Sequence, residues 1–216
     1  GYYELYVNGR KIGEQVLNPA QTTYDVRAFY TVHDITSGIN PGRNAVGIWL
    51  GNGFYGQNIA FADRQLAWGS PVLICKIIID YIDGTSEAVV SDESWKAETG
   101  PIVFDNVYAG ETYDARRERA GWNVPGYDDF RWQKAVKVPP PCATLIGQAI
   151  PPVRKMSAIK PRRIIAGKDN KWIFDIGRNI SGWARIRVNE PADTRITLRF
   201  AEALAPDGED LDVSTH

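Results

Sequence analysis

The sequence has 216 residues, and its 25 Lys and Arg against 26 Asp and Glu give a formal net charge of −1 at pH 7. This near-neutral balance lacks the basic excess that attracts nucleic acids and anionic membranes, so we expect neither as a partner. With 44% hydrophobic residues and no apolar run of the roughly 20 residues that a bilayer crossing needs, the chain is expected to form one large or two small globular domains.

The first predicted element is a β-hairpin. Residues 3–7 alternate between apolar and polar side chains, and Asn8-Gly9 is a strong signal for a two-residue turn between strands. Shorter strands are expected at 24–32 and 44–50, because clusters of turn-forming residues separate them. One weak helical pattern occurs at 59–68. Good helix formers at a helical period are missing elsewhere, so the chain is predicted to be all-β.

A second hairpin is predicted from a β-branched run at 72–82 that meets Asp83-Gly84 and returns through 85–90. Because the run is unbroken rather than alternating, we expect its first strand to be buried on both faces.

Two proline clusters, at 139–141 and 151–152, predict a stiff extended connector that takes no part in a packed sheet. The domain prediction follows from it. An antiparallel β-sandwich of the galactose-binding-like or jelly-roll type occupies 1–138, a Pro-rich connector 139–152, and the opening strands of an incomplete second β-domain 153–216.

In that second domain, strands are predicted at 171–177, 180–188 and 194–204, and a turn at 190–193 joins the last two. Alternation in the last two strands gives one basic face and one apolar face. The apolar face comprises Ile186, Val188, Ile196, Leu198 and Phe200. The basic face is interpreted as a solvated or domain-covered surface rather than a ligand site.

The residues that usually carry metal or nucleophile chemistry are scarce. Cys75 and Cys142 are expected to be buried free thiols rather than a disulfide, and the two histidines are too few for a His-ligated zinc site or a Ser-His-Asp relay. The acidic run at 207–212 fits no EF-hand spacing, so neither a metal site nor a cofactor is expected. The chain opens at Gly1-Tyr2 without a starter Met, which we interpret as an excised segment of a longer protein.

Residues 51–56 form a G-x-G-x-x-G sequence after an expected strand, which raises the possibility of a dinucleotide site. The expected context is missing, since no helix follows and no carboxylate lies about 20 residues on. We therefore predict a tight glycine turn that presents Phe54 and Tyr55, either to a core or to a sugar ring.

Carboxylates are plentiful in the middle of the chain, and a glycosidase needs two of them beside the scissile bond. Several arginines lie close by in the sequence, so salt bridges and solvation are the favoured roles. The six carboxylates are Asp105, Glu111, Asp114, Glu118, Asp128 and Asp129. A separate set of residues could form an exposed sugar-binding cluster if the fold brings them together. These candidates are Asn52, Phe54, Tyr55, Tyr108, Glu111 and Tyr113.

Five stretches, in this order, resemble bacterial α-L-rhamnosidases over essentially the whole chain. They are YELYVNG (3–9), DIT followed by PGRN (34–44), LGNGFYG (50–56), DESWKAETG through RAGW (92–122), and FDIGRNISGWARIRV with RFAE (174–202). The chain departs from the family pattern at Arg178, where Gln is expected.

The resemblance implies an N-terminal accessory β-domain and a second β-domain, with inverting hydrolysis in an α-helical barrel downstream. The family's catalytic residues therefore have no matching positions here, and this chain alone is expected to be inactive. Its expected partners are its own downstream catalytic domain and rhamnose-containing glycans, and a periplasmic or secreted location is favoured over the cytoplasm. Two alternatives stay open: an autonomous carbohydrate-binding module, and a complete glycosidase that uses loop carboxylates.

Overall fold

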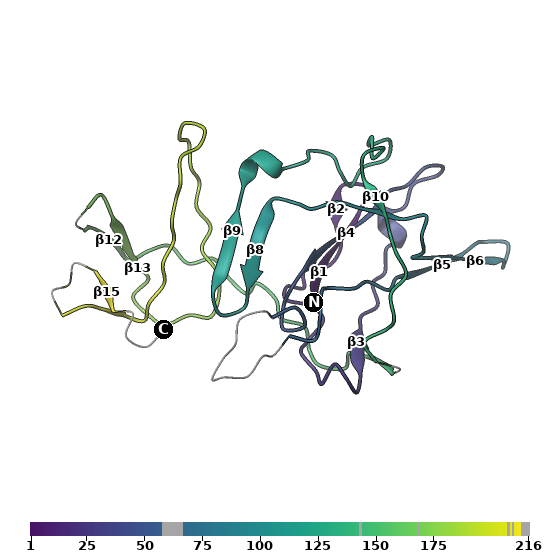
Figure 1. Ribbon diagram of the computed structural model, residues 1–216, viewed down its shortest axis with the longest axis horizontal. Helices are drawn as coiled ribbons and strands as arrows, with labels where there is room; N and C mark the ends of the chain where they lie inside the picture. The colour runs from purple at the N-terminus through teal and green to yellow at the C-terminus, as the bar shows by residue number, and fades with distance from the viewer. Residues whose placement is uncertain (58–66, 143, 168, 207, 209, 213–216) are drawn as a thin grey trace. The chain divides into compact units, whose positions relative to one another are not determined.

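The computed structural model describes residues 1–57, 67–142, 144–167, 169–206, 208 and 210–212. It divides into two compact units, residues 1–154 and 155–216, and each is described by itself (Figure 1). Apart from two single-turn 3₁₀ helices, η1 (Thr36–Gly38) and η2 (Ala115–Arg117), every described element is a β-strand. The predicted all-β class is confirmed. The helical pattern at 59–68 lies, except for its last two residues, outside the described residues.

The described part of the first unit holds eleven strands, most of them short. They are β1 (Tyr2–Val7), β2 (Arg10–Lys11), β3 (Ala28–Tyr30), β4 (Val46–Gly51), β5 (Lys76–Asp80), β6 (Ser86–Val90), β7 (Lys96–Ala97), β8 (Ile102–Asn106), β9 (Gly110–Tyr113), β10 (Gln133–Lys134) and β11 (Leu145–Gly147). They pair as β2-β1-β4, β5-β6, β7-β10, β8-β9 and β3-β11. All of these pairings are antiparallel except β3-β11.

The first predicted hairpin is confirmed. β1 pairs with β2 across Asn8 and Gly9, whose φ values of 50° and 82° are the left-handed values that the two central residues of a type I′ turn need. The Asn8 side chain accepts a hydrogen bond from the Ala45 N–H at 2.8 Å and donates one to the Gly38 carbonyl at 2.8 Å. These bonds tie the turn to the loop that enters β4, so β4 can pair with β1 along its whole length.

Trp122 is the centre of an aromatic cluster that packs on this sheet. Its ring meets Tyr6 of β1 and Trp49 of β4 edge-on, with centroids 5.6 and 6.3 Å apart, and it stacks on Trp132 at 6.5 Å. Gly47 leaves room for the indole, because a Cβ at that position would clash with it. Trp122 thus links side chains of β1 and β4 to Trp132, which lies far from both strands in the sequence.

The second predicted hairpin forms, but it is not buried. β5 and β6 pair along their full length, and Gly84 adopts a φ of 85° in the turn. Figure 1 shows the two-stranded ribbon projecting from the rest of the first unit. Ile78 is 61% exposed and Ile82 is fully exposed. The expectation of burial on both faces is wrong, because no described element covers the outer face; the apolar run reflects the β propensity of branched side chains.

The proline-bracketed segment 139–152 also differs from expectation. It contains β11, which pairs in parallel with β3, and the Gln148 side chain accepts a hydrogen bond from the Ala20 N–H at 2.8 Å. The expectation that this segment stays out of a sheet is therefore wrong at 145–147. Prolines lack the N–H that a ladder needs, but the residues between the two proline clusters keep theirs and can pair.

In its described residues, the second unit has four strands in two antiparallel pairs. β12 (Arg163–Ala166) pairs with β13 (Trp172–Asp175), and β14 (Ala203–Leu204) pairs with β15 (Leu211–Asp212). Ile173 on β13 is its buried apolar side chain. The strand predicted at 171–177 is thus confirmed by β13.

The strand predicted at 180–188 does not form, and only the last two residues of the one predicted at 194–204 pair, as β14. Residues 180–188 and 194–202 have no ladder pairing, although Thr194 N–H does bond to the Pro191 carbonyl at 3.3 Å in the predicted turn. The expected apolar face is exposed along its length, with Phe200 66% exposed. A lone pair of strands is marginally stable, and no described element covers these side chains, so the alternation alone does not produce a sheet.

Both cysteines are free, as expected, but each is half-exposed rather than buried. None of the helices in the described part of the chain has the length and apolar character of a membrane-spanning segment.

Candidate functional site

The G-x-G-x-x-G sequence forms a compact turn at the end of β4. The Gly56 N–H donates to the Asn52 carbonyl at 2.9 Å, and Gly53 has a φ of 51°. A Cβ at position 53 would lie 3.0 Å from the Tyr2 backbone nitrogen, so glycine is needed there for both conformation and space. No helix begins within residues 51–57, which agrees with the interpretation of a glycine turn over a dinucleotide site.

Phe54 packs toward the tip of the β8-β9 hairpin. Its ring meets Tyr2 and Tyr108 edge-on, with centroids 6.4 and 6.3 Å away. The tip is held by the Asn106 side chain, which accepts hydrogen bonds from the Tyr108 N–H at 2.9 Å and the Ala109 N–H at 3.0 Å. Tyr108 is 55% exposed, so the hairpin presents its ring to solvent in a fixed backbone frame.

Asn52 joins the glycine turn to β8. Its backbone N–H donates to the Asp105 carboxylate at 2.9 Å, and its side-chain amide donates to the same carboxylate and to the Asp105 carbonyl at 3.2 Å. Gly51 makes room for this contact, since a Cβ there would lie 2.9 Å from a carboxylate oxygen of Asp105. The amide and the carboxylate therefore orient each other.

Glu111 lies directly opposite Asp105 in the β8-β9 ladder. Burial and the neighbouring Asp105 charge raise the pKa of the Glu111 carboxyl, because both disfavour its charged form. Five residues thus form one group, which we call the Asn52–Tyr108 cluster. Its members are Asn52, Phe54, Asp105, Tyr108 and Glu111.

Two candidates from the sequence lie outside this cluster. Tyr55 is only 7% exposed and packs edge-on against Tyr24 at 5.2 Å. Tyr113, at the far end of β9, donates its hydroxyl to Glu118; burial and that bond raise its pKa to about 12. The consecutive aromatic side chains Phe54 and Tyr55 thus pack against different partners, which the sequence motif alone does not determine.

Asp105 was not among the sugar-binding candidates, yet it holds the cluster together. A signal for it was present in the sequence. Asp105 and Glu111 flank a turn that ends in Gly110, so a hairpin with these two carboxylates opposite each other could have been predicted.

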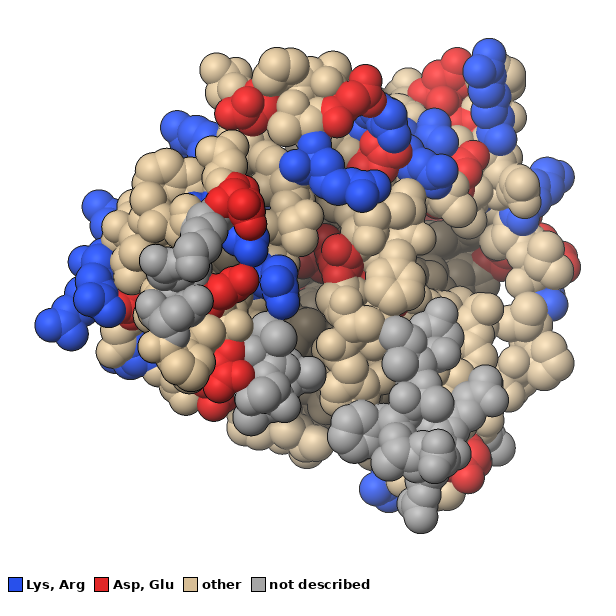
Figure 2. All heavy atoms as spheres, turned by 60° about the vertical axis from the view of Figure 1, so that its left-hand side comes forward, with Lys and Arg blue, Asp and Glu red and all other residues tan. Residues whose placement is uncertain are grey.

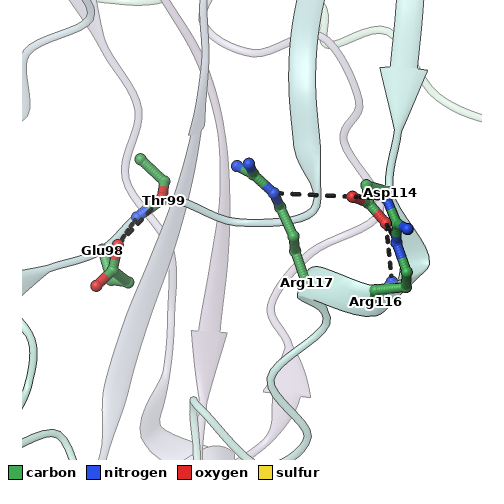
Figure 3. Close-up of polar contacts among 5 residues, drawn as sticks. All are labelled: Glu98, Thr99, Asp114, Arg116 and Arg117. Atoms are coloured by element: carbon green, nitrogen blue, oxygen red, sulfur yellow. Dashed lines mark hydrogen bonds and ion pairs between the residues drawn. The ribbon is translucent and has the colours of Figure 1, made fainter.

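Asp114, which precedes η2, serves a structural role (Figure 3). Its carboxylate accepts the Arg116 N–H at 3.1 Å, pairs with the Arg116 guanidinium at 2.8 Å and lies 3.8 Å from the Arg117 guanidinium. The hydrogen bond from the Arg116 side chain is the main reason that the pKa of Asp114 is lowered. Figure 3 also shows Glu98 bonded to the N–H and hydroxyl of Thr99, which lower the pKa of Glu98.

The remaining carboxylates are engaged in the same way. Asp129 pairs with Lys96 at 2.7 Å, and Asp128 accepts the Phe130 N–H at 3.2 Å. The structural role expected for these loop carboxylates agrees with these contacts. Figure 2 shows acidic and basic side chains mixed over the face in view. The described residues contain no group of three or more His, Cys, Asp or Glu suited to hold a metal ion.

The Asn52–Tyr108 cluster therefore combines an exposed aromatic ring, an oriented amide and two adjacent carboxylates. Aromatic faces pack on the C–H faces of sugars, while amides and carboxylates bond to their hydroxyls. The Asp105 carboxylate is occupied by Asn52, so Asp105 is not a free acid or base beside Glu111.

Comparison with known proteins gives two family matches along the chain. Residues 1–157 match the α-L-rhamnosidase N-terminal domain, and residues 165–215 match the bacterial α-L-rhamnosidase concanavalin-like domain. An α-L-rhamnosidase of Formosa agariphila is 44% identical over 98% of this chain and 23% of its own length. One from Streptomyces avermitilis is 38% identical over 96% of this chain and 20% of its own length.

Solved structures agree. The crystal structure of Streptomyces avermitilis α-L-rhamnosidase complexed with L-rhamnose matches 97% of this chain and 20% of that chain, with a TM-score of 0.92 and 37% identity. The α-L-rhamnosidase of Dictyoglumus thermophilum matches 85% of this chain and 20% of that chain, with a TM-score of 0.77 and 40% identity. This chain spans only about a fifth of the length of these relatives. It belongs to the α-L-rhamnosidase family, to the region made of the N-terminal domain and the concanavalin-like domain.

Proposed function

We propose that this chain is the non-catalytic N-terminal region of a longer α-L-rhamnosidase, in which it supports a downstream catalytic barrel that releases terminal α-L-rhamnose with inversion. The observation that carries the proposal is the pair of successive family matches together with the short share, 20–23%, that the chain covers of its curated relatives. The contacts of Asp105, Asp114 and Asp129 also support it, because each of these carboxylates already has a partner in the described part of the chain.

The Asn52–Tyr108 cluster, in this proposal, helps to hold rhamnose-containing glycans. Tyr108 supplies an exposed ring and Glu111 a carboxylate on the same hairpin. Asn52 supplies its side-chain carbonyl, since its amide N–H groups already donate to Asp105. The same geometry favours the second candidate function, an autonomous carbohydrate-binding module. The two differ in whether the isolated chain binds sugar strongly enough to act without the rest of the enzyme.

Titration of the 216-residue chain with L-rhamnose and methyl α-L-rhamnoside, followed by NMR, tests the cluster. Tyr108→Ala and Glu111→Gln are expected to weaken binding by about tenfold, since each removes a stacking or hydrogen-bonding contact. Tyr81→Ala is the matched control, because Tyr81 is also an exposed tyrosine near a hairpin turn. Equal binding by all three variants would remove the cluster from the proposal.

A second assay tests the non-catalytic assignment. The isolated chain is expected to give no turnover of an aryl α-L-rhamnoside, because acid–base catalysis needs positioned carboxylates that the family resemblance places downstream. Turnover that Glu111→Gln or Asp114→Asn abolishes would instead support a complete enzyme that uses loop carboxylates.

A further inference from the structure

A groove of about 410 Å³ lies in the first unit, lined by residues that the Asn52–Tyr108 cluster does not use. This volume falls within the roughly 300–1,000 Å³ of typical small-molecule sites. Its walls come from the segment before β3, from β3 itself, from Trp68 and from the residues after β11. The lining includes Gln21, Thr22, Arg27, Phe29, Trp68 and Ile150.

The polar wall is held in place by a turn. The Thr23 carbonyl accepts the N–H groups of Val26 and Arg27, each at 2.9 Å, so the backbone returns on itself just before β3. The Arg27 Nε donates to the Thr22 hydroxyl at 3.1 Å. This bond uses one of the five N–H donors of the guanidinium and leaves the other four for a ligand.

The aromatic wall is also anchored. The Trp68 N–H donates to the Tyr55 carbonyl at 3.0 Å, and the indole meets the buried Tyr24 ring edge-on at 5.1 Å. The Trp68 side chain is nevertheless 39% exposed. An indole that is fixed on one side and open on the other is suited to pack against a ligand ring.

Arg27 is the one charged residue that lines the groove, and it has no carboxylate partner among the described residues. A guanidinium offers paired donors that match the two oxygens of a carboxylate. The neighbouring amide and hydroxyl groups match sugar hydroxyls instead. We propose that this groove binds a saccharide that bears a carboxylate, a hexuronate residue, with the carboxylate on Arg27 and the ring against Trp68.

This site is separate from the one in the proposed function. Trp68 packs on Tyr24, whereas Phe54 packs on Tyr108, and the groove lining shares no residue with the Asn52–Tyr108 cluster. The groove would thus bind an acidic sugar of a glycan independently of any rhamnose that the Asn52–Tyr108 cluster binds. Failure of either proposal leaves the other standing.

The test is a calorimetric or NMR titration of the 216-residue chain with three methyl glycosides that share one ring. They are the methyl glycoside of galacturonic acid with its carboxylate free, the methyl ester of that glycoside, and methyl galactoside. We expect a dissociation constant on the order of 1 mM for the uronate. The ester and the galactoside are expected to bind about tenfold or more weakly, because they lose the charge-assisted bonds. Added salt should weaken uronate binding alone.

Variants assign the binding to the groove. Arg27→Gln and Trp68→Ala are each expected to weaken uronate binding at least about tenfold, while Arg27→Lys keeps the charge and loses less. Arg43→Gln and Trp183→Ala are the matched controls, since both residues are exposed and lie outside the groove. Tyr108→Ala should leave uronate binding unchanged.

Several outcomes would overturn the proposal. Equal affinity for the uronate and the galactoside would show that no carboxylate is recognised. Stronger binding of galactose 6-sulfate than of the uronate would show that the groove selects a sulfate ester. Undiminished binding by folded Arg27→Gln, with a circular dichroism spectrum like that of the parent chain, would place the ligand elsewhere, and no binding by the parent chain would remove the site.

Discussion

The first hairpin, at β1-β2, and the segment 180–202 have the same kind of sequence, yet only one of them forms a sheet. Both alternate apolar and polar residues around a turn. In the first hairpin, Asn8 bonds to two neighbouring loops, β4 adds a third strand and Trp122 packs on the sheet. In 180–202 the turn forms, but no ladder bonds follow and the apolar side chains stay exposed.

The difference shows what alternation does and does not specify. It determines which side chains share a face, but a stable ladder also needs a covered face and a further strand. Side-chain contacts from distant parts of the sequence provide both in the first hairpin.

Removing the aromatic cover of the first sheet should have the largest effect. Trp122→Ala is expected to lower the free energy of unfolding by about 3 kcal/mol, because it leaves a void against Tyr6, Trp49 and Trp132. Urea denaturation measures the change. The matched variant Trp183→Ala, within 180–202, should change it by less than about 0.5 kcal/mol. Similar losses in both variants would contradict the contrast.

Loss of the turn contacts should have the next largest effect. Asn8→Ala removes the bonds to Ala45 and Gly38 and puts alanine at a φ of 50°, so the free energy of unfolding should fall by about 1–2 kcal/mol. Asn8→Gly keeps the backbone conformation, so it should lower the free energy of unfolding by less than Asn8→Ala. Glu190→Ala, an exposed position beside the turn of 180–202, should lower the free energy of unfolding by less than about 0.5 kcal/mol. A larger loss at Glu190 than at Asn8 would contradict this prediction.

Lowering the pH should reduce the free energy of unfolding of the first unit by less than either of these substitutions. His33 lies 2.7 Å from the Tyr3 hydroxyl on β1, and burial lowers its pKa below the usual 6.5. The folded state therefore binds the proton less readily than the unfolded state. The contribution of His33 to the free energy of unfolding is therefore fully present above pH 6.5 and is lost as the pH falls below that value. His33→Asn should reduce the pH dependence of the free energy of unfolding between about pH 6.5 and 5, as measured by urea denaturation. An unchanged pH dependence would show that His33 is not the group responsible.

Polar substitution of the uncovered face should have the smallest effect. Phe200→Ser is expected to leave the free energy of unfolding of this chain within about 0.5 kcal/mol of the parent, because Phe200 is already 66% exposed. Thermal unfolding with circular dichroism detection is sufficient to check it. A clear destabilisation would mean that this side chain is buried in solution.

Much of the fold could be predicted from local signals. Asn8, Gly9 and Gly84 set the two hairpin turns through positive φ values that few other residues adopt, and such preferences act within a few residues. What failed was the prediction of burial. The run at 72–82 resembles a doubly covered strand, and 145–147 resembles part of a connector, because cover and pairing depend on residues far away in the sequence.

The candidate site likewise depends partly on local sequence signals and partly on contacts between distant residues. The sequence motifs brought Asn52, Phe54, Tyr108 and Glu111 into consideration, and the structure places them together. Tyr55 and Tyr113 are directed elsewhere by contacts with Tyr24 and Glu118, which no motif reveals. The groove at Arg27 and Trp68 could not be predicted at all, since its walls come from three separate segments and carry no local pattern.

Hydrogen–deuterium exchange of the 216-residue chain, read by mass spectrometry, compares backbone protection in the first sheet and in 180–202. Peptides that cover β1 and β4 should be protected for minutes or longer, because their N–H groups are bonded in a covered three-stranded sheet. Peptides within 180–202 should exchange at nearly the rate of an unfolded chain. Equal and strong protection of both regions would contradict the account, since it would mean that alternation around a turn is enough to build a stable ladder here.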